Sequence, residues 1–493
     1  MRFAFALVFF LAAATLRAAE KPNILVILAD DVGYGDLSCY GGKAPTPNCD
    51  RVAREGLKFT SAYATDSTCT PSRYSLLTGR YAFRQKGTGV LPGDAKLIIP
   101  TDKPTLPGIL KSVGYRTGVV GKWHLGLGAG EAPLDWNQEI RPSPNDVGFD
   151  YSFIMAATGD RVPCVYVEDR HVVGLDPADP IEVRYTKAPY PGEPDGVANR
   201  AELRMDWSVG HNAAVVNGVG RIGYMKGGKK ALWKDETMSE EFTRRAVQFI
   251  ERSKEGPFFL YFATHNIHVP RLVGAQFVGK SGMGPRGDSI LEFDWQVGEI
   301  LATLERLKLT EKTLVILSSD NGPVLDDGYK DEAVKLVGDH RPAGPWSGGK
   351  YTILEGGTRV PMLARWPGRI KPGVSEALIS QVDFAATFAE LAGTTVPTGG
   401  APDSLNMLPA LLGDSPTGRE FIVEDSNGVA IRVGSWKFIP PGKKAGAVAR
   451  LYDLEHDPAE KQNVAAEHPE QVTVLGARLE ALRGREGTAA DGK

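Results

Sequence analysis

The sequence is poor in cysteine. Its 493 residues include only four, Cys39, Cys49, Cys69 and Cys164. Four cysteines in a chain of this length do not form the disulfide framework of a small secreted scaffold. Free thiols are therefore the expectation, and Cys39 and Cys49, the two closest in sequence, are the candidate pair if one disulfide forms.

The chain also lacks an excess of charge of either sign. Lys and Arg number 57 against 60 Asp and Glu, which favours neither nucleic acid nor an anionic membrane surface as a partner. No repeat or low-complexity segment interrupts a composition of 42% apolar and 24% charged residues, which is typical of a globular protein. At 493 residues we expect one large domain and one smaller domain.

No apolar run is long enough to span a bilayer comfortably, so we expect no stable membrane span. The longest run follows Met1-Arg2 over residues 3–14 and ends in small residues at Ala18 and Ala19. This pattern predicts a secretory signal peptide over residues 1–19 and a periplasmic or extracellular protein. Because Arg17 is unusual so close to a cleavage site, an uncleaved signal that tethers the protein to the membrane remains the alternative.

Continuous apolar runs predict buried parallel strands. Each run ends in polar residues, and ligands of such sheets bind beyond the carboxyl ends of the strands. Amphipathic stretches separate the runs, so the sequence predicts an α/β sheet flanked by helices. The runs cover residues 23–29, 117–120, 258–263 and 313–318, and the amphipathic stretches cover 105–112, 238–252 and 289–307.

The composition divides the chain into two domains. We expect a catalytic domain over residues 20–400, within which residues 126–235 form a loop-rich insertion with short strands. A linker rich in Gly and Pro follows at about 397–404. Residues 405–485 then predict a smaller α+β domain, built on a short antiparallel sheet and covered by a helix near 468–483.

Cys69 begins the segment Cys69-Thr70-Pro71-Ser72-Arg73. Pro71 suits the first turn of a helix and Gly79 suits its end. The free N–H groups and the positive end of the helix dipole would hold an anionic group, sulfate or phosphate, near residue 69. A cysteine taken alone is more often a small buried apolar residue.

Hard oxygen donors follow two of the predicted strands. Asp30 and Asp31 follow the first run, and Asp320 and Asn321 follow the last. Each pair alone is common in turns. Together they supply three carboxylates and an amide oxygen, which suit Ca²⁺, with Mg²⁺ as the alternative.

Cationic side chains suit the same edge of the sheet. Lys122 and His124 follow the second run and project to one side of an extended segment. Lys350 follows two glycines, which let the backbone approach a ligand closely. An exposed lysine or a structural histidine is the alternative for each, and the position after strands of one sheet favours a shared anion site.

The cysteine segment resembles the signature of the type I sulfatases of the alkaline phosphatase superfamily. The resemblance covers nearly the whole mature chain and favours the bacterial carbohydrate sulfatases. It implies a large, mixed, mostly parallel sheet flanked by helices. Further matching segments are Asp30-Asp31, Thr46-Pro47-Asn48 with Asp50-Arg51, Gly121-Lys122-Trp123-His124, His268-Val269-Pro270, Asp320-Asn321-Gly322, and Lys350 with Glu355-Gly356-Gly357.

The resemblance implies a maturation step and a mechanism. A formylglycine-generating enzyme would convert Cys69 to formylglycine (3-oxoalanine), whose hydrate attacks sulfur. Arg73 would acidify that hydrate, and His268 would protonate the leaving oxygen. The implied Ca²⁺ ligands are Asp30, Asp31, residue 69, Asp320 and Asn321; Lys122 and Lys350 would neutralise sulfate, and His124 would act as the base that releases it.

Five further residues are expected in loops near the pocket. His265 is a substrate contact or a supporting residue, and the pairs His340-Arg341 and Asp160-Arg161 are sugar contacts or surface ion pairs. The expected substrate is a sulfated sugar of a glycan, such as galactose or N-acetylgalactosamine. The alternatives are a phosphodiesterase or phosphonate hydrolase of the same superfamily, and a non-catalytic protein that binds sulfated glycan.

Overall fold

The structure is a computed structural model that describes residues 21–186, 188–444 and 446–484. The expected signal peptide, residues 1–19, lies outside the described residues, as does residue 485 at the end of the expected smaller domain. Cys39, Cys49, Cys69 and Cys164 are all free thiols. The candidate disulfide between Cys39 and Cys49 is therefore not formed.

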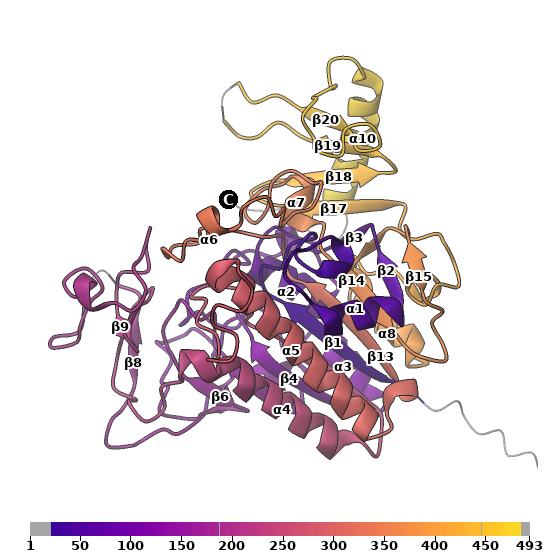
Figure 1. The fold of residues 1–493 in the computed structure, drawn as a ribbon. Coiled ribbons are helices and arrows are strands. Elements are labelled where there is room, and N and C mark those ends of the chain that lie inside the picture. The colour runs from indigo at the N-terminus through magenta and orange to yellow at the C-terminus, as the bar shows by residue number, and fades with distance from the viewer. Residues whose placement is uncertain (1–20, 187, 445, 485–493) are drawn as a thin grey trace, which may run out of the picture.

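A ten-stranded mixed sheet forms the centre of the molecule (Figure 1). Five neighbouring strands, β13, β1, β12, β4 and β5, run parallel. Antiparallel strands adjoin both sides of this group. The mostly parallel α/β sheet that the sequence predicted is confirmed. In spatial order the strands are β15 (Gly373–Ser375), β2 (Leu57–Phe59), β14 (Met362–Arg365), β13 (Thr313–Ser319), β1 (Asn23–Ala29), β12 (Phe258–Ala263), β4 (Arg116–Lys122), β5 (Tyr151–Met155), β6 (Tyr166–Glu168) and β7 (His171–Val172).

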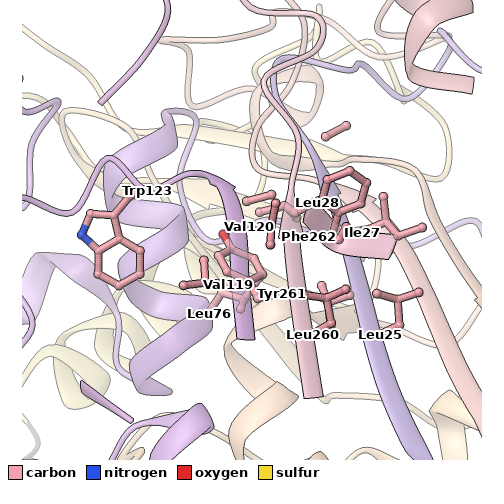
Figure 2. Packing of buried hydrophobic residues seen from close by; sticks show 14 of the residues in the cluster. Leu25, Ile27, Leu28, Leu76, Val119, Val120, Trp123, Leu260, Tyr261 and Phe262 are labelled. Atoms are coloured by element: carbon pink, nitrogen blue, oxygen red, sulfur yellow. The ribbon is translucent and has the colours of Figure 1, made fainter. Parts of the chain in front are cut away.

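The central strands lie in the hydrophobic core. Every residue of β1, β12 and β13 is buried. Figure 2 shows Leu25, Leu260 and Val119 from three neighbouring strands in this core. Because both faces are covered, the middle of each strand is a continuous apolar run without alternating polar residues, which is why the sequence predicted these strands clearly.

Helices cover the sheet in two groups. Helices α1 (Pro47–Arg54), α4 (Met238–Ser253) and α5 (Gly284–Arg306) form one group, in which α5 contacts both α1 and α4. Figure 1 shows α4 and α5 lying side by side across the sheet. Helices α2 (Cys69–Thr78), α3 (Leu106–Ser112) and α8 (Phe384–Leu391) contact one another in the second group.

Helices α3 and α4 match the expected stretches 105–112 and 238–252 closely. Helix α5 begins earlier than the expected stretch 289–307. Helix α5 starts at Gly284 because Pro285 occupies its first turn, where the missing N–H costs nothing. In the part of the chain that the structure describes, no helix is long and apolar enough to cross a membrane.

The segment 126–235 contributes short strands to the main sheet. Its strands β5, β6 and β7 extend the main sheet, which its Gly- and Pro-rich composition did not indicate. The remainder forms two small antiparallel pairs. These are β8 (Glu182–Arg184) with β11 (Tyr224–Lys226), and β9 (Val215–Val216) with β10 (Val219–Gly220).

The C-terminal part carries a separate four-stranded antiparallel sheet, seen at the top of Figure 1. Strands β17 (Phe421–Asp425), β18 (Val429–Val433), β19 (Trp436–Ile439) and β20 (Arg450–Asp453) follow one another in space. Helix α10 (Pro469–Arg483) packs against this sheet. This smaller antiparallel sheet and its covering helix confirm the prediction.

The remaining elements are short. Strand β3 (Ala62–Tyr63) pairs with β16 (Ile379–Ser380). The short α-helices are α6 (Ala333–Leu336), α7 (Glu355–Thr358) and α9 (Leu408–Leu411). The 3₁₀ helices are η1 (Ser38–Tyr40), η2 (Ala82–Arg84), η3 (Pro144–Val147), η4 (Arg200–Glu202), η5 (Asp235–Thr237), η6 (Thr310–Lys312) and η7 (Gln381–Asp383).

A buried lysine joins the C-terminal sheet to helix α7. The Nζ of Lys437 on β19 lies 3.1 Å from a carboxylate oxygen of Glu355, 3.0 Å from Glu424 and 3.1 Å from Glu460. Glu355 belongs to α7 of the larger part, whereas Glu424 belongs to β17. Burial raises the pKa of Glu460 to about 7 although Lys437 opposes this. The ammonium group therefore compensates several carboxylates that water does not reach.

We expect Lys437→Ala to lower the free energy of unfolding by about 3–5 kcal/mol, because it leaves buried carboxylates without their cation. Lys461→Ala is the matched control, since Lys461 is exposed and follows Glu460 directly. Urea denaturation of the two variants measures the difference. Equal stability of the two variants would show that the buried lysine does not stabilise the contact between the C-terminal sheet and helix α7.

Candidate active site

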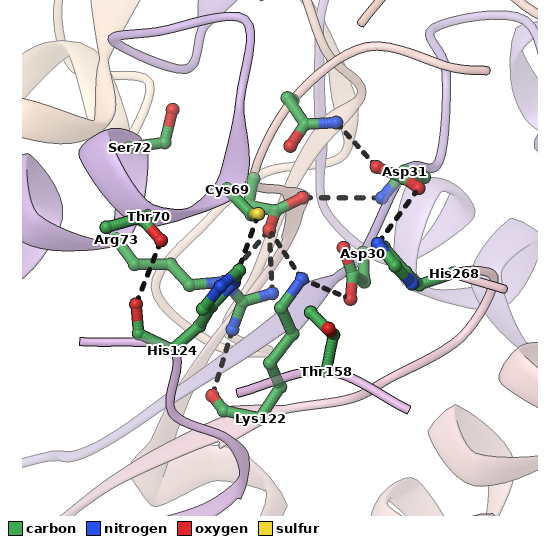
Figure 3. A network of polar contacts seen from close by, with 12 residues as sticks. Asp30, Asp31, Cys69, Thr70, Ser72, Arg73, Lys122, His124, Thr158 and His268 are labelled. Atoms are coloured by element: carbon green, nitrogen blue, oxygen red, sulfur yellow. Dashed lines mark hydrogen bonds and ion pairs between the residues drawn. The ribbon is translucent and has the colours of Figure 1, made fainter. Parts of the chain in front are cut away.

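Polar residues from four parallel strands meet at one edge of the sheet. Asp30 and Asp31 follow β1, and Asp320 follows β13. Lys122 ends β4, and His268 lies in the loop after β12. The carboxyl ends of parallel strands share one edge, and Figure 3 shows Asp30, Asp31, Lys122 and His268 gathered there.

Cys69 is the first residue of α2, as the sequence predicted. The helix ends at Gly79, whose φ of 62° is left-handed and favours glycine. The Sγ of Cys69 lies 3.2 Å from Nδ1 of His124. Thr70 donates a hydrogen bond of 3.0 Å to the carbonyl of His124 and so fixes this residue against the helix. Burial raises the pKa of the Cys69 thiol although Lys122 and Lys350 oppose this.

Arg73 and Lys122 form a buried ion network with two carboxylates. Arg73 contacts Oδ2 of Asp320 through Nε at 2.9 Å and through a terminal nitrogen at 2.7 Å. It also donates to the carbonyl of Lys122 at 3.0 Å. The Nζ of Lys122 lies 2.6 Å from Oδ2 of Asp30 and 3.9 Å from Oδ2 of Asp320. Arg73 therefore pairs with Asp320, and Lys122 lies between Asp30 and Asp320.

Lys350 is held by two carboxylates on the other side of the site. Its Nζ lies 2.9 Å from Oδ2 of Asp31 and 2.8 Å from Oδ2 of Asp327. Asn321 donates to the second oxygen of Asp31 at 2.8 Å. The Nε2 of His268 lies 4.0 Å from Asp31 and 3.8 Å from Asp327. His268 and Lys350 thus face the same pair of carboxylates.

The oxygen atoms of this network fit a hard divalent cation. Oδ1 of Asp30 and Oδ1 of Asn321 are buried and have no hydrogen-bond partner among the described residues. Burial raises the pKa of Asp30 to about 8 in spite of Lys122. Burial also opposes the charge of Asp31, but Lys350 and Lys122 hold its pKa below the ordinary value. Carboxylate and amide oxygens without partners are the donors that Ca²⁺ prefers.

The hydrogen bonds of the two histidines assign their tautomers. Nε2 of His124 lies 2.9 Å from the carbonyl of Leu91, and Nδ1 of His268 lies 2.8 Å from that of Val269. Because a carbonyl only accepts, each of these nitrogens carries the proton. Burial and Lys122 lower the pKa of His124 well below its usual range, and burial and Lys350 do so for His268. Nδ1 of His124 therefore presents a lone pair to residue 69.

Asp160 and Arg161 lie beside this centre. Arg161 contacts Asp160 at 3.5 Å and donates to Thr158 at 3.2 Å, and its charge contributes to the low pKa of His124. Asp160 also lies 2.8 Å from Nε2 of His211. The structure thus brings this predicted pair to the site.

The other three expected substrate contacts lie in different surroundings. His265 is buried, its Nδ1 lacks a partner in the part of the chain that the structure describes, and burial lowers its pKa to about 4. His340 lies 2.8 Å from Asp36, which Arg286 also contacts. Arg341 is exposed. The structure does not join His340 or Arg341 to the residues around Cys69.

The sequence reasoning missed Asp327 and His211. Asp327 lies five residues beyond Gly322 in the loop after β13, and a second acidic residue after that motif was the available signal. His211 lies in the segment read as loop-rich insertion, and nothing in its neighbourhood marked it. Both residues reach the site through loops.

Residues 22–394 match the sequence profile of the family described as Sulfatase. The chain belongs to the sulfatase family. It is 49% identical over 484 residues to an N-acetylgalactosamine-6-O-sulfatase of Bacteroides thetaiotaomicron, covering 95% of this chain and 94% of that relative. It is 34% identical over 511 residues to human arylsulfatase A, covering 95% and 90%. The predicted resemblance and sulfuric ester hydrolase activity are confirmed.

Solved structures agree with this assignment. A structure from work on glycosaminoglycan metabolism by Bacteroides thetaiotaomicron superposes with a TM-score of 0.93 at 49% identity, covering 95% of this sulfatase and 100% of that chain. A sulfatase of Pseudoalteromonas sp. superposes with a TM-score of 0.71 at 24% identity, covering 96% and 92%. The second likeness shows the shared fold.

We expect Asp327→Asn to lower kcat/KM for a sulfate ester by about tenfold or more, because Lys350 loses one of the two charges that position it. The neighbouring Asp326→Asn is the control, since Asp326 is exposed and accepts a hydrogen bond from Ser208. Steady-state kinetics of both variants test this. Equal rates would exclude a positioning role for Asp327.

Proposed function

We propose that this sulfatase hydrolyses a sulfate ester on a sugar, with formylglycine at position 69 and Ca²⁺ beside it. One observation carries the proposal. Residue 69 meets the unprotonated Nδ1 of His124 at 3.2 Å, while Lys122 and Lys350 each contact a carboxylate that can also bind a cation. A nucleophile position, a base and an anion site thus coincide at the buried start of a helix.

Asp30, Asp31, Asp320, Asn321 and residue 69 would hold Ca²⁺, which supplies positive charge beside the anionic group of the substrate. The formylglycine hydrate supplies a hydroxyl nucleophile and a second hydroxyl, through which sulfate leaves by elimination. Conversion of Cys69 requires a formylglycine-generating enzyme. The unpartnered oxygens of Asp30 and Asn321 support the cation assignment.

The charged side chains would stabilise the transferring sulfate group. Lys122 and Lys350 neutralise its oxygens, and Arg73 lowers the cost of negative charge at residue 69. All three side chains are buried, and in such a water-excluded site fixed charges act strongly. Their carboxylate partners hold them in place before the substrate arrives, so little reorganisation accompanies the reaction.

The two histidines would move protons in opposite directions. His124 accepts the proton from the second hydroxyl at residue 69, since its free Nδ1 faces that position. His268 protonates the leaving oxygen from Nε2, which Asp31 and Asp327 face at 4.0 and 3.8 Å. This step needs a second proton on the ring, because Nδ1 already carries one. Burial and Lys350 lower the pKa of His268, and Asp327 opposes them, so His268 would take up this proton only with the help of the facing carboxylates.

The substrate class follows from the similarity to the Bacteroides enzyme, which is 49% identical over nearly the full length of both chains. We propose a 6-sulfated N-acetylgalactosamine residue of a glycan. Asp160, Arg161 and His265 remain the proposed sugar contacts, whereas His340 and Arg341 have no contact that supports this role. Phosphodiesters are the alternative substrates, because they fit the same cations.

The proposed setting is outside the cytoplasm. The apolar segment of residues 3–14 supports export to the periplasm or the medium, with a membrane tether if residues 1–19 stay attached. A sulfated glycan in those surroundings would then be accessible to the enzyme.

Residues 20–400 form the proposed catalytic domain, and residues 405–485 form the proposed smaller domain.

We expect Cys69→Ala to lower kcat for N-acetylgalactosamine 6-sulfate by at least about 10³-fold, because the nucleophile is removed. Cys39→Ala is the control, since Cys39 is a free thiol outside the site. Mass spectrometry of the peptide containing residue 69 tests the maturation step. An active enzyme with only the thiol at residue 69 would refute formylglycine chemistry, and faster turnover of a phosphodiester would favour the alternative substrate.

We expect Ca²⁺ to bind this protein in isothermal titration calorimetry and Asp320→Asn to weaken that binding by at least about tenfold, because an anionic ligand is lost. Asp453→Asn serves as the control, since Asp453, Glu455 and His456 form a second, partly exposed acidic group. Loss of the signal in Asp453→Asn alone would move the cation site away from residue 69.

A further inference from the structure

A polar cavity of about 290 Å³ lies beside the reaction centre. Its walls come from four segments: the residues before and within the first turn of α2, the loop after η2, the residue after Lys350, and the turn between β17 and β18. The lining residues are Asp66, Thr68, Pro71, Ala82, Thr88, Gly89, Val90, Tyr351, Asp425, Ser426 and Asn427.

The cavity shares its walls with the catalytic machinery. Thr68 and Pro71 flank residue 69 in the chain. Tyr351 follows Lys350, and its hydroxyl donates 2.9 Å to Asp327. The loop that contributes Val90 continues to Leu91, whose carbonyl fixes His124. The cavity therefore shares a wall with the site, although the side chains of Cys69, Lys122 and His124 do not line it.

The cations of the reaction centre do not line the described part of the cavity. Its described lining contains two carboxylates and no lysine or arginine. Asp66 is only 6% exposed. Its Oδ1 accepts hydrogen bonds from the amide and the hydroxyl of Thr68 at 2.8 and 2.7 Å, whereas no described residue donates to its Oδ2. That oxygen is available to a donor in the cavity.

The C-terminal sheet supplies the second carboxylate. Asp425 at the end of β17 is attached to the segment before α2 by two backbone hydrogen bonds, from Ser67 to Asp425 at 3.0 Å and from Asp425 to Thr65 at 3.1 Å. Burial raises the pKa of Asp425 to about 6, so this carboxyl is mostly ionised at pH 7. The smaller sheet thus completes a wall of the cavity.

Burial, and then Asp425, raises the pKa of Asp66 well above its usual range, so Asp425 is the main negative charge of the cavity. We propose that this cavity binds the uncharged, hydroxyl-bearing part of the sulfated sugar, and that Asp425 selects against a second anionic group on it. The proposal rests on the sugar sulfatase function proposed above. Carboxylates accept hydrogen bonds from sugar hydroxyls, and the half-exposed ring of Tyr351 offers an apolar face to the sugar ring. A second sulfate would meet like charge in a confined space.

The experiment compares N-acetylgalactosamine 6-sulfate with the 4,6-disulfate. We expect the wild-type enzyme to favour the monosulfate by at least about tenfold in kcat/KM, and Asp425→Asn to narrow this ratio by about fivefold, because one repulsive charge is removed. Glu420→Gln is the control. Glu420 directly precedes β17, and its carboxylate is exposed and pairs with Arg478. The control is expected to keep the wild-type ratio.

Measurements of sugar binding test this inference independently of the catalytic proposal. Isothermal titration calorimetry of Cys69→Ala and of the double variant Cys69→Ala with Asp425→Asn uses the same two sugars and needs no turnover. A monosulfate preference that narrows in the double variant supports the cavity assignment. Equal affinity of Cys69→Ala for both sugars, or an unchanged preference in the double variant, would overturn it. Selective binding without turnover of either sugar by converted enzyme would refute only the proposed function.

Discussion

The structure depends on the mutual neutralisation of buried charges at the carboxyl edge of the parallel sheet. Arg73, Lys122 and Lys350 are buried, and so are Asp30, Asp31 and Asp320. Each ion would be very costly there alone, whereas cations and carboxylates in contact compensate one another. The observed order of strands, with β1 between β12 and β13, brings these residues to one edge of the sheet. Formation of the sheet therefore builds the site.

The core strands could be predicted because burial on both faces leaves a continuous apolar run, and β1, β12 and β13 carry such runs. Strands β5 to β7 could not be placed in the sheet. β7 is only two residues long, and Gly- and Pro-rich loops surround all three, so no period identified their partners. The start of α5 was also missed, although Pro285 marked it. Short edge elements depend on tertiary contacts that local sequence does not encode.

The same distinction applies to the site. Residues at or directly after the ends of core strands, such as Asp30, Lys122 and Asp320, were predictable because the strand fixes where they point. Asp327 and His211 lie on loops, and their contacts depend on how those loops return to the sheet. His340 shows the reverse case, since it pairs with Asp36 away from the expected pocket mouth. Chain proximity to a motif is weaker information than position on a strand.

Residues in and next to the first turn of α2 face two different surroundings. In the first turn of α2, the side chain of residue 69 faces His124, while Thr68 and Pro71 line the cavity. Successive residues of a helix point in different directions, so neighbours in sequence can serve different surroundings. Lys122 and Lys350 act on the first position together with their carboxylate partners, whereas carboxylates without lysine or arginine line the described cavity. A sulfated, otherwise neutral sugar matches this difference, because its anionic end needs a cation and its hydroxyls need hydrogen-bond acceptors.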